Sequence, residues 1–307
     1  MTTRFLSATI EVERKFLPPR ILMHALTRSL TPALPMPPLL PPSIARRMRM
    51  HHPAVDFVRD VYYDRADEGL AAKGLWIRRR SVCGPAPYFV TSSWEAKVRV
   101  GGDFTASQFV EVDGAAAVER EIFRVLGDPS VSLHKIDEHL RTISDLTTRR
   151  LSARLELTSS EEESSLSTPL RNLTVAVDEV IQTTNGDLAS ACMTLEREFA
   201  HKDDNENCLP PRSIPADAFF HQIGVLEVVE QMRIGRADSE DLEGVDLEDL
   251  AQWHEAHRKA VAAARSAQLE DFMRAFPALF PLTPKPRGKL SAYADWVKAK
   301  QQGELVR

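Results

Sequence analysis

The feature that most constrains how this chain can fold is a one-sided charge along its predicted strands. In the stretch TIEVERKF, residues 9–16, Glu11, Glu13 and Lys15 occupy every second position. Successive side chains of a strand point to opposite faces, so these three share one face. Five later predicted strands repeat the pattern, at 57–64, 74–81, 88–100, 107–113 and 147–157. Their charged face carries Asp60, Tyr62 and Asp64; Trp76, Arg78 and Arg80; Glu95, Lys97 and Arg99; Glu111 and Asp113; and Thr148, Arg150, Arg154 and Glu156.

Two arrangements are consistent with this alternation. In an ordinary half-exposed sheet, the charged face meets solvent and the opposite face, with Val12, Ile77 and Leu151, covers the core. The chain also carries amphipathic helical stretches, however, and these must bury their apolar sides on the apolar face of the strands. We predict such helices at 19–30, 115–126, 132–143 and 248–275. The charged face is then concave, and the expected fold is α+β, a closed antiparallel β-barrel with helices packed outside.

Such a barrel would hold many charged groups of both signs in its interior. Buried charges are tolerated when they are paired, hydrated or ligated. Arginine forks suit phosphate oxygens, and carboxylates suit Mg²⁺, which prefers oxygen ligands. The interior therefore favours a metal-polyphosphate as ligand.

The length of the chain and the positions of its turn signals and proline-rich or polar stretches predict one domain with insertions. The 307 residues are 43% hydrophobic, enough for a sizeable core. A hairpin is expected between strands at 172–182 and 191–200, because Asn185-Gly186 between them is a strong turn signal. A further strand is predicted at 221–232. We expect a single domain over 1–307 with a proline-rich insertion, free of regular helix and central strand, at about 31–53, and polar loops at about 158–169, 201–216 and 235–247.

Charge and cysteine content limit the partners. A net charge of -5 argues against bulk attraction to nucleic acid or to an anionic membrane. Three cysteines without a CxxC pair favour reduced thiols, and neither a signal peptide nor a membrane span is visible. We expect a cytoplasmic monomer whose partner is a small molecule, with no nucleic acid and no membrane.

A set of ordered motifs gives a family resemblance. EVERK (11–15) matches the ExExK signature of the CYTH, or triphosphate tunnel metalloenzyme, superfamily. The motif is short, but it is followed in order by VYYD, LWIRRR, WEAK, FVEV, TTRR and GKLSAY. The runs IEVERKFLP, YYD and WIRRR make the chain resemble the thiamine triphosphatases most, over about residues 8–293. This resemblance implies an eight-stranded antiparallel tunnel that binds a triphosphate with Mg²⁺ or Mn²⁺.

The resemblance also assigns roles to residues. It implies that Lys15 pairs with Tyr62 in catalysis, with Glu13 as the competing base. It implies substrate binding by Lys15, Trp76, Arg78, Arg80, Lys97, Arg150 and Lys289, and metal binding by Glu11, Glu13, Glu111, Asp178 and Glu227. Trp76 would stack on the thiamine ring, whereas Arg79 would point outward. Arg154 and Glu156 are expected to form an ion pair in the tunnel.

Two positions depart from the family pattern. Val225 stands where the first of two alternating acids is expected in the late strand, and Ala176 stands where thiamine triphosphatases carry an acid. Glu227 takes the second late position. Glu230 could replace the missing acid only through a bulge, and Glu196 with Glu198 offers an alternating pair in another register. We prefer Asp178 and Glu227, because the long helix and GKLSAY follow that strand in the expected order.

The expected activity is hydrolysis of the terminal phosphoanhydride of thiamine triphosphate, giving thiamine diphosphate and phosphate. Inorganic tripolyphosphate hydrolysis and ATP cyclisation are the alternatives on the same fold. A weakly active polyphosphate- or nucleotide-binding protein is the alternative from another class, and it is motivated by Val225 and Ala176.

Overall fold

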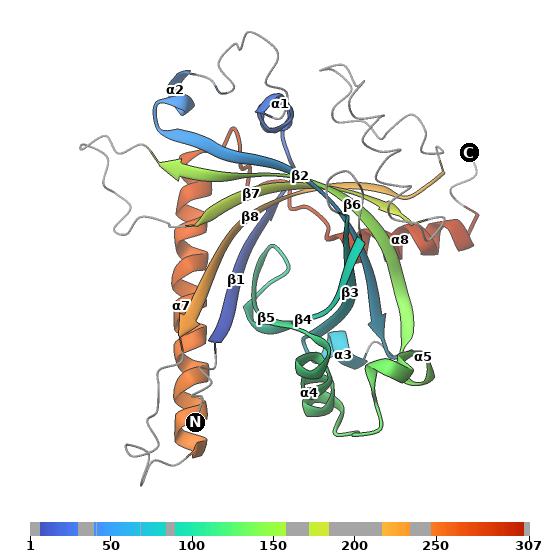
Figure 1. Cartoon of the computed structure of the whole chain (residues 1–307). Coiled ribbons are helices and arrows are strands. Elements are labelled where there is room, and N and C mark those ends of the chain that lie inside the picture. Colours follow the sequence, from blue (N-terminus) through green and yellow to red (C-terminus); the bar gives the residue numbers. More distant parts are fainter. Residues whose placement is uncertain are drawn as a thin grey trace.

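The computed structural model describes residues 7–29, 40, 42–67, 69–83, 90–157, 172–183, 217–233 and 247–303. Its described strands form a closed barrel in which all neighbours are antiparallel (Figure 1). Around the barrel the order is β1 (Ser7–Phe16), β5 (Ala106–Asp113), β4 (Val90–Gly102), β3 (Leu75–Cys83), β2 (Met48–Asp64), β6 (Arg141–Leu157), β7 (Leu173–Gln182) and β8 (Phe220–Arg233), which pairs with β1. The expected α+β fold, an eight-stranded antiparallel barrel with helices outside, is confirmed.

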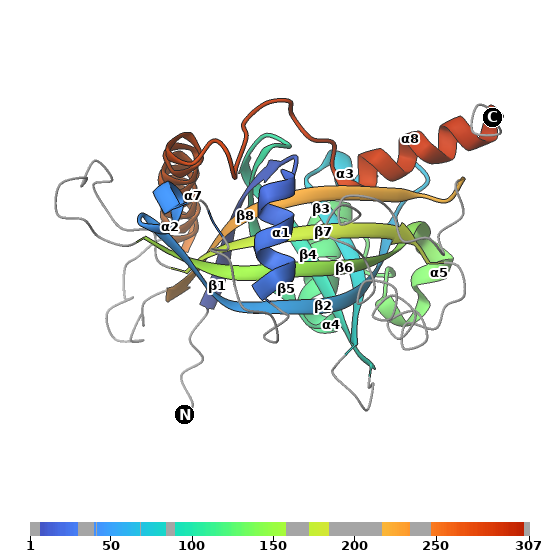
Figure 2. The same cartoon turned by 90° about the horizontal axis from the view of Figure 1, so that it is seen from above.

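The helices lie on the outer surface of the barrel. The long helix α7 (Leu247–Ala275) packs along β1, and α1 (Arg20–Ser29) lies across β6, β7 and β8 (Figure 2). The remaining helices of the described residues are α2 (Pro42–Ala45), α3 (Gly69–Ala72), α4 (Ala115–Leu126), a 3₁₀ turn at Leu133–Lys135, α5 (Ile136–His139) and α8 (Lys289–Gln301). Among the described residues, no helix is both long and apolar enough to cross a membrane.

Two apolar clusters hold most of these helices against the outward strand faces, and a third packs α8 on Leu146, Val180 and Phe219. In the larger one, Leu22 and Leu26 of α1 and Phe272 of α7 are buried with outward residues of the barrel such as Leu151 and Leu226. The smaller one joins α3, α4 and α5 to β3 and β4; its buried members are Leu70, Leu75, Ile77, Ala96, Val118, Ile122, Leu133, Ile136 and Leu140. The apolar face of the strands is therefore outside, and the charged face lines the interior.

The strand β2 differs from the expectation. It begins at Met48, so the proline-rich insertion predicted at 31–53 is wrong over 48–53, and residues 42–45 form the short helix α2. Pro53 fits into a strand because the pairing of β2 with β6 shifts register between His51 and Ala54. A proline lacks the N–H that a regular ladder needs, and such an irregularity removes that requirement.

The expected hairpin between 172–182 and 191–200 is wrong. A strand has two edges, and those of β7 pair with β6 and β8. The barrel therefore closes without 191–200, which lies outside the described residues, as do the polar loops at 158–169 and 201–216 and most of the loop at 235–247. The helix predicted over 132–143 is also shorter, since Leu140 is extended and β6 begins at Arg141.

Candidate functional site

A cavity of about 310 Å³ lies within the barrel. Residues of all eight strands and of the start of α8 line it. Nine of the predicted site residues line it: Glu13, Lys15, Tyr62, Trp76, Arg78, Lys97, Arg150, Asp178 and Lys289. Glu11 lies next to this lining through its contact with Lys97, and Arg80, Glu111 and Glu227 are not part of the lining. The charge pattern of the strands therefore converges on one space.

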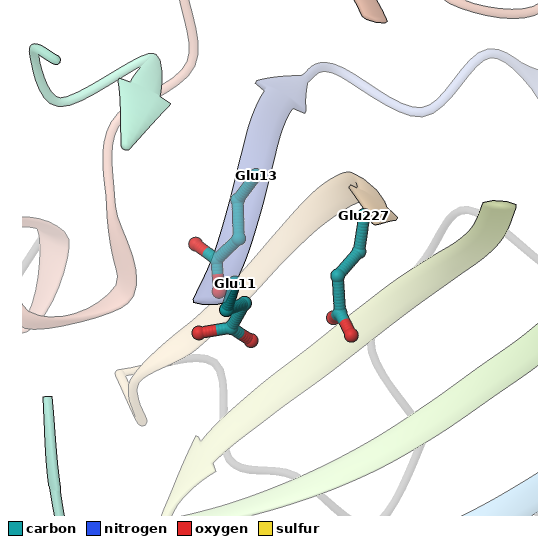
Figure 3. Close-up of side chains that lie close together, drawn as sticks. All are labelled: Glu11, Glu13 and Glu227. Atoms are coloured by element: carbon teal, nitrogen blue, oxygen red, sulfur yellow. The ribbon is translucent and has the colours of Figure 1, made fainter. Parts of the chain in front are cut away.

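Three glutamates form a carboxylate cluster at this site (Figure 3). Glu11 and Glu13 come from β1, and Glu227 comes from β8, where it pairs in register with Glu13. One oxygen from each carboxylate lies within 4.8 Å of the others. Burial, together with the neighbouring carboxylates, raises the pKa of Glu11 and of Glu227. Burial also acts to raise the pKa of Glu13, but the ammonium groups of Lys97 and Lys15 outweigh it and hold that pKa well below its ordinary value.

The ammonium group of Lys97 lies against this cluster. It donates to Glu11 and, at 2.8 Å, to Glu13, and it lies 3.5 Å from Glu111. Burial would lower the pKa of Lys97, but Glu11 and Glu13 raise it instead. A resident cation therefore neutralises part of the carboxylate charge.

Asp60 is a second charge centre, which the sequence did not single out. Its carboxylate is fully buried and accepts from both Nε and Nη2 of Arg80, at 2.8 and 2.9 Å, and from Lys289 at 3.1 Å. Arg78 Nε lies 3.8 Å away. Burial acts to raise the pKa of Asp60, but the three cations outweigh it and hold the pKa well below its usual range. Asp60 thus fixes the positions of three predicted phosphate-binding cations; its place on the charged face was the only signal in the sequence.

Asp178 does not join the carboxylate cluster. It binds Arg150 through two hydrogen bonds, of 2.7 and 2.9 Å. Burial would raise the pKa of Asp178, but Arg150 lowers it. Glu111 also lies apart from the three glutamates, 3.8 Å from Arg78 and 3.5 Å from Lys97. The structure therefore brings together three of the five predicted metal ligands.

Lys15 and Tyr62 border the same cavity but bind other partners. Lys15 Nζ donates to Ser107 Oγ at 2.8 Å and lies 2.7 Å from Glu13 Oε2. The Tyr62 hydroxyl accepts from Arg78 at 3.4 Å, and Arg78 also donates to Glu95 at 2.8 Å. The expected Lys15–Tyr62 pair is thus not formed in this structure. Ser107 and Glu95 are contacts that the motifs did not indicate.

Trp76 lies in the cavity wall, with its ring already in contact with protein groups. Its centroid is 5.5 Å from that of Phe109, edge to face, and the Arg99 guanidinium lies 5.0 Å from the indole. Arg79 is exposed, as expected for the outward face. The rings of Trp76 and Phe109 give this side of the cavity an apolar surface.

The remaining alternatives are resolved by strand pairing. β8 pairs with β1 without a register shift, and Glu230 lies on its outer face, 2.6 Å from Arg265 of α7. Glu230 therefore cannot replace the acid missing at Val225. Glu196 and Glu198 lie outside the described residues. The predicted tunnel pair of Arg154 and Glu156 is wrong: both side chains are exposed, and Glu156 lies 2.9 Å from His51.

The charged groups of the site can bind both a phosphate chain and a metal ion. A guanidinium has five N–H donors, and the hydrogen bonds of Arg80 to Asp60 and of Arg150 to Asp178 use two each, so donors remain for a phosphate chain. Its glutamate cluster offers only oxygen donors, the set preferred by Mg²⁺ and Mn²⁺. Cations and carboxylates converge on the same cavity, so an anionic ligand and a hard metal ion can be bound side by side.

Comparisons with known proteins give no family assignment. No protein-family profile and no curated protein matches the chain. A proposed adenylyl cyclase from Hippeastrum with a dominant triphosphatase activity is 11% identical, with 94% of this chain and 95% of that chain covered and a TM-score of 0.41. A proposed adenylate cyclase from Bacillus halodurans is also 11% identical, with 92% and 96% covered and a TM-score of 0.36. Likenesses at these scores carry no argument, so fold and site rest on the strand pairing and contacts of this chain.

Proposed function

We propose that this chain is a metal-dependent hydrolase of triphosphates, built on the tunnel of the CYTH superfamily. One observation carries the proposal: six cationic side chains line one cavity inside a closed barrel, and a cluster of three carboxylates reaches this cavity through its member Glu13. The cations are Lys15, Arg78, Lys97, Arg99, Arg150 and Lys289. A phosphate chain and a divalent cation together would complement both sets of charges.

The cations would bind and orient the phosphate chain. Asp60 positions Arg80 and Lys289, and Asp178 positions Arg150, so these donors are held in place before the ligand binds. Fixed donors of this kind need little reorganisation when charge develops on the phosphate oxygens. Positioning and charge stabilisation are the main contributions a protein makes to phosphoryl transfer.

Mg²⁺ or Mn²⁺ would be held by Glu11, Glu13 and Glu227, the cluster with suitable donors. When bound, the ion would neutralise charge on the terminal phosphate and polarise it. Asp178 and Glu111 would instead position phosphate-binding cations, since each lies against a basic side chain. Lys15, held between Glu13 and Ser107, would take part in proton transfer, with Glu13 as its partner.

We propose thiamine triphosphate as the substrate, on the resemblance of the IEVERKFLP, YYD and WIRRR runs. Inorganic tripolyphosphate is the second candidate, because the described cation set requires only a phosphate chain.

The test is phosphate release from thiamine triphosphate, tripolyphosphate and ATP, each with Mg²⁺ and with EDTA. We expect Mg²⁺-dependent release that Lys15→Ala lowers by at least 100-fold, while Arg79→Ala, on the outward face of β3, leaves it within twofold. Release no faster than the buffer blank for all three substrates would refute the proposal. A preference for thiamine triphosphate below about tenfold, roughly 1.4 kcal/mol, would refute the specific substrate alone.

A further inference from the structure

The inner face of the barrel is divided into a charged and an apolar part. β1, β3 and β4 contribute alternating acids and bases, whereas β7 and β8 contribute Ala176, Ile223 and Val225 at neighbouring positions, with Asp178 and Glu227 at the two ends of this apolar group. Ile223 and Val225 line the cavity and, like Ala176, are buried, with 3%, 5% and 3% of their surface exposed. Leu290 of α8 lines the same cavity. We call Ile223, Val225 and Leu290 the apolar wall.

Cations border this wall. Val225 pairs in register with Lys15, and Ile223 pairs with Asp178, which binds Arg150. Leu290 follows Lys289 in the chain. A phosphate chain bound by these three cations would therefore lie at the edge of the wall. Phosphate oxygens gain nothing from an apolar surface, whereas an organic group attached to the chain would remove that surface from water.

The size of the cavity agrees with such a group. About 310 Å³ lies within the range of cavities that hold small organic ligands, roughly 300–1,000 Å³. Across the cavity the indole of Trp76 is already in contact with Arg99 and Phe109. Trp76, Phe104 and Phe109 supply aromatic lining, and the wall formed by β8 and α8 is the aliphatic lining of the same cavity.

We propose that the apolar wall binds the organic group of an organic triphosphate and makes the site prefer such esters over inorganic tripolyphosphate. This inference rests on the proposed function and deepens it. The valine at 225 then has a role of its own: it removes a charge where the organic group lies.

The experiment compares Val225→Thr and Val225→Glu with the wild type, using thiamine triphosphate, ATP and inorganic tripolyphosphate with Mg²⁺. Threonine keeps the shape of valine and adds a hydroxyl, so it tests the apolar contact without adding charge. We expect wild-type kcat/KM to be at least tenfold higher for an organic triphosphate than for tripolyphosphate. Val225→Thr should lower that ratio three- to tenfold through the organic substrate alone, and Val225→Glu should remove the preference.

A matched control and a second measurement make each outcome decisive. Arg79→Ala should leave the ratio unchanged, and thermal melts should show that both Val225 variants fold. The preference for organic over inorganic triphosphate can also be obtained from dissociation constants, measured by calorimetry in EDTA. A chain without activity would refute the proposed function, but its dissociation constants would still test the apolar wall. A wild type that binds tripolyphosphate as tightly as both organic triphosphates would overturn the inference, as would a Val225→Thr variant that weakens all three equally.

Discussion

At the scale of single residues, the site consists of charges that are already paired. Buried ions are costly unless a partner and further hydrogen bonds compensate them, and each described cation of the interior discussed above has such a partner. Arg80 binds Asp60, Arg150 binds Asp178, and Lys97 binds Glu11 and Glu13. A ligand must therefore compete with, or add to, these pairs.

Lys97 provides a test of this competition. Its ammonium group contacts two of the three carboxylates that would hold a metal ion. We expect Lys97→Gln to bind Mn²⁺ about tenfold more tightly, because a neutral amide removes charge repulsion of well over 1 kcal/mol at such distances. Calorimetry or electron paramagnetic resonance without substrate measures this. Lys97→Arg, which keeps the charge, is the control, and weaker Mn²⁺ binding by Lys97→Gln would contradict the role.

Asp60 should make the fold sensitive to acid. Its pKa lies well below the ordinary value of 3.8 because Lys289, Arg78 and Arg80 outweigh the effect of burial. A depressed pKa contributes stability that is fully present above the unfolded-state value and is lost as the pH falls through the folded-state value. We expect Asp60→Asn to lower the free energy of unfolding by about 3 kcal/mol at pH 7, since it leaves buried cations without their carboxylate.

The pH dependence separates this charge effect from a packing defect. As the pH falls from about 5 to 3 the wild type should lose part of its advantage over Asp60→Asn, because the carboxyl of Asp60 takes up a proton in the unfolded chain while it stays charged in the folded one. Urea unfolding at pH 7, 5, 4 and 3 measures the difference. A difference that stays constant over this range would show that the carboxylate charge is not the cause.

For single residues of the site, the sequence predicted correctly whether a side chain points into or out of the barrel, because this depends only on the two-residue period of a strand. That period placed Glu11, Glu13, Arg78 and Lys97 inward and Arg79 outward, as observed. It could not choose their partners, because these depend on which strands become neighbours. Glu13 and Glu227 are distant in the sequence, and only the closure of β1 on β8 brings them together.

At the scale of elements, the same limit applies to strand ends and pairing. The strand pattern of 172–182 was correct, but a good turn signal suggested the wrong neighbour, since β7 is enclosed by β6 and β8. For β2, local composition suggested an irregular segment, whereas pairing with β6 extends the strand back to Met48. Tertiary pairing overrode local preference in both cases.

Gly224 tests the packing between β1 and β8. It pairs in register with Phe16, and a Cβ at this position would lie 2.4 Å from Phe16 Cε2. Phe16 is fully buried against Phe280, so its ring has little room to move. We expect Gly224→Ala to lower the free energy of unfolding by about 1–3 kcal/mol through overpacking. Denaturant unfolding measures this.

Gly69→Ala is the matched control for Gly224→Ala. Its added Cβ would lie 2.9 Å from Asp67 Oδ1 and 3.5 Å from Arg65 Cδ, and both belong to exposed side chains that can shift. We expect a change within about 0.5 kcal/mol, as for most surface substitutions. Equal effects of the two substitutions would show that the Phe16 contact is not the cause.

At the scale of the whole molecule, the site joins parts of the chain that are distant in sequence. Its cations and acids come from all eight strands of the barrel and from the start of α8. A ligand that contacts all of these binds the closed barrel and not the unfolded chain. Binding should therefore raise the stability of the entire fold by mass action.

The last prediction follows from this coupling. At a free ligand concentration of about 100 times the dissociation constant, the stabilisation is about 2.7 kcal/mol, which corresponds to several degrees in Tm for a chain of this size. We expect tripolyphosphate with Mn²⁺ to raise Tm by more than either component alone, because the carboxylate cluster and the cations bind different partners. Scanning calorimetry in Mn²⁺ and in EDTA measures the shifts. In Glu11→Gln/Glu227→Gln the contribution of Mn²⁺ should vanish while that of tripolyphosphate remains, since its cations are unchanged. If the double variant keeps the full Mn²⁺ shift, the three glutamates do not hold the metal.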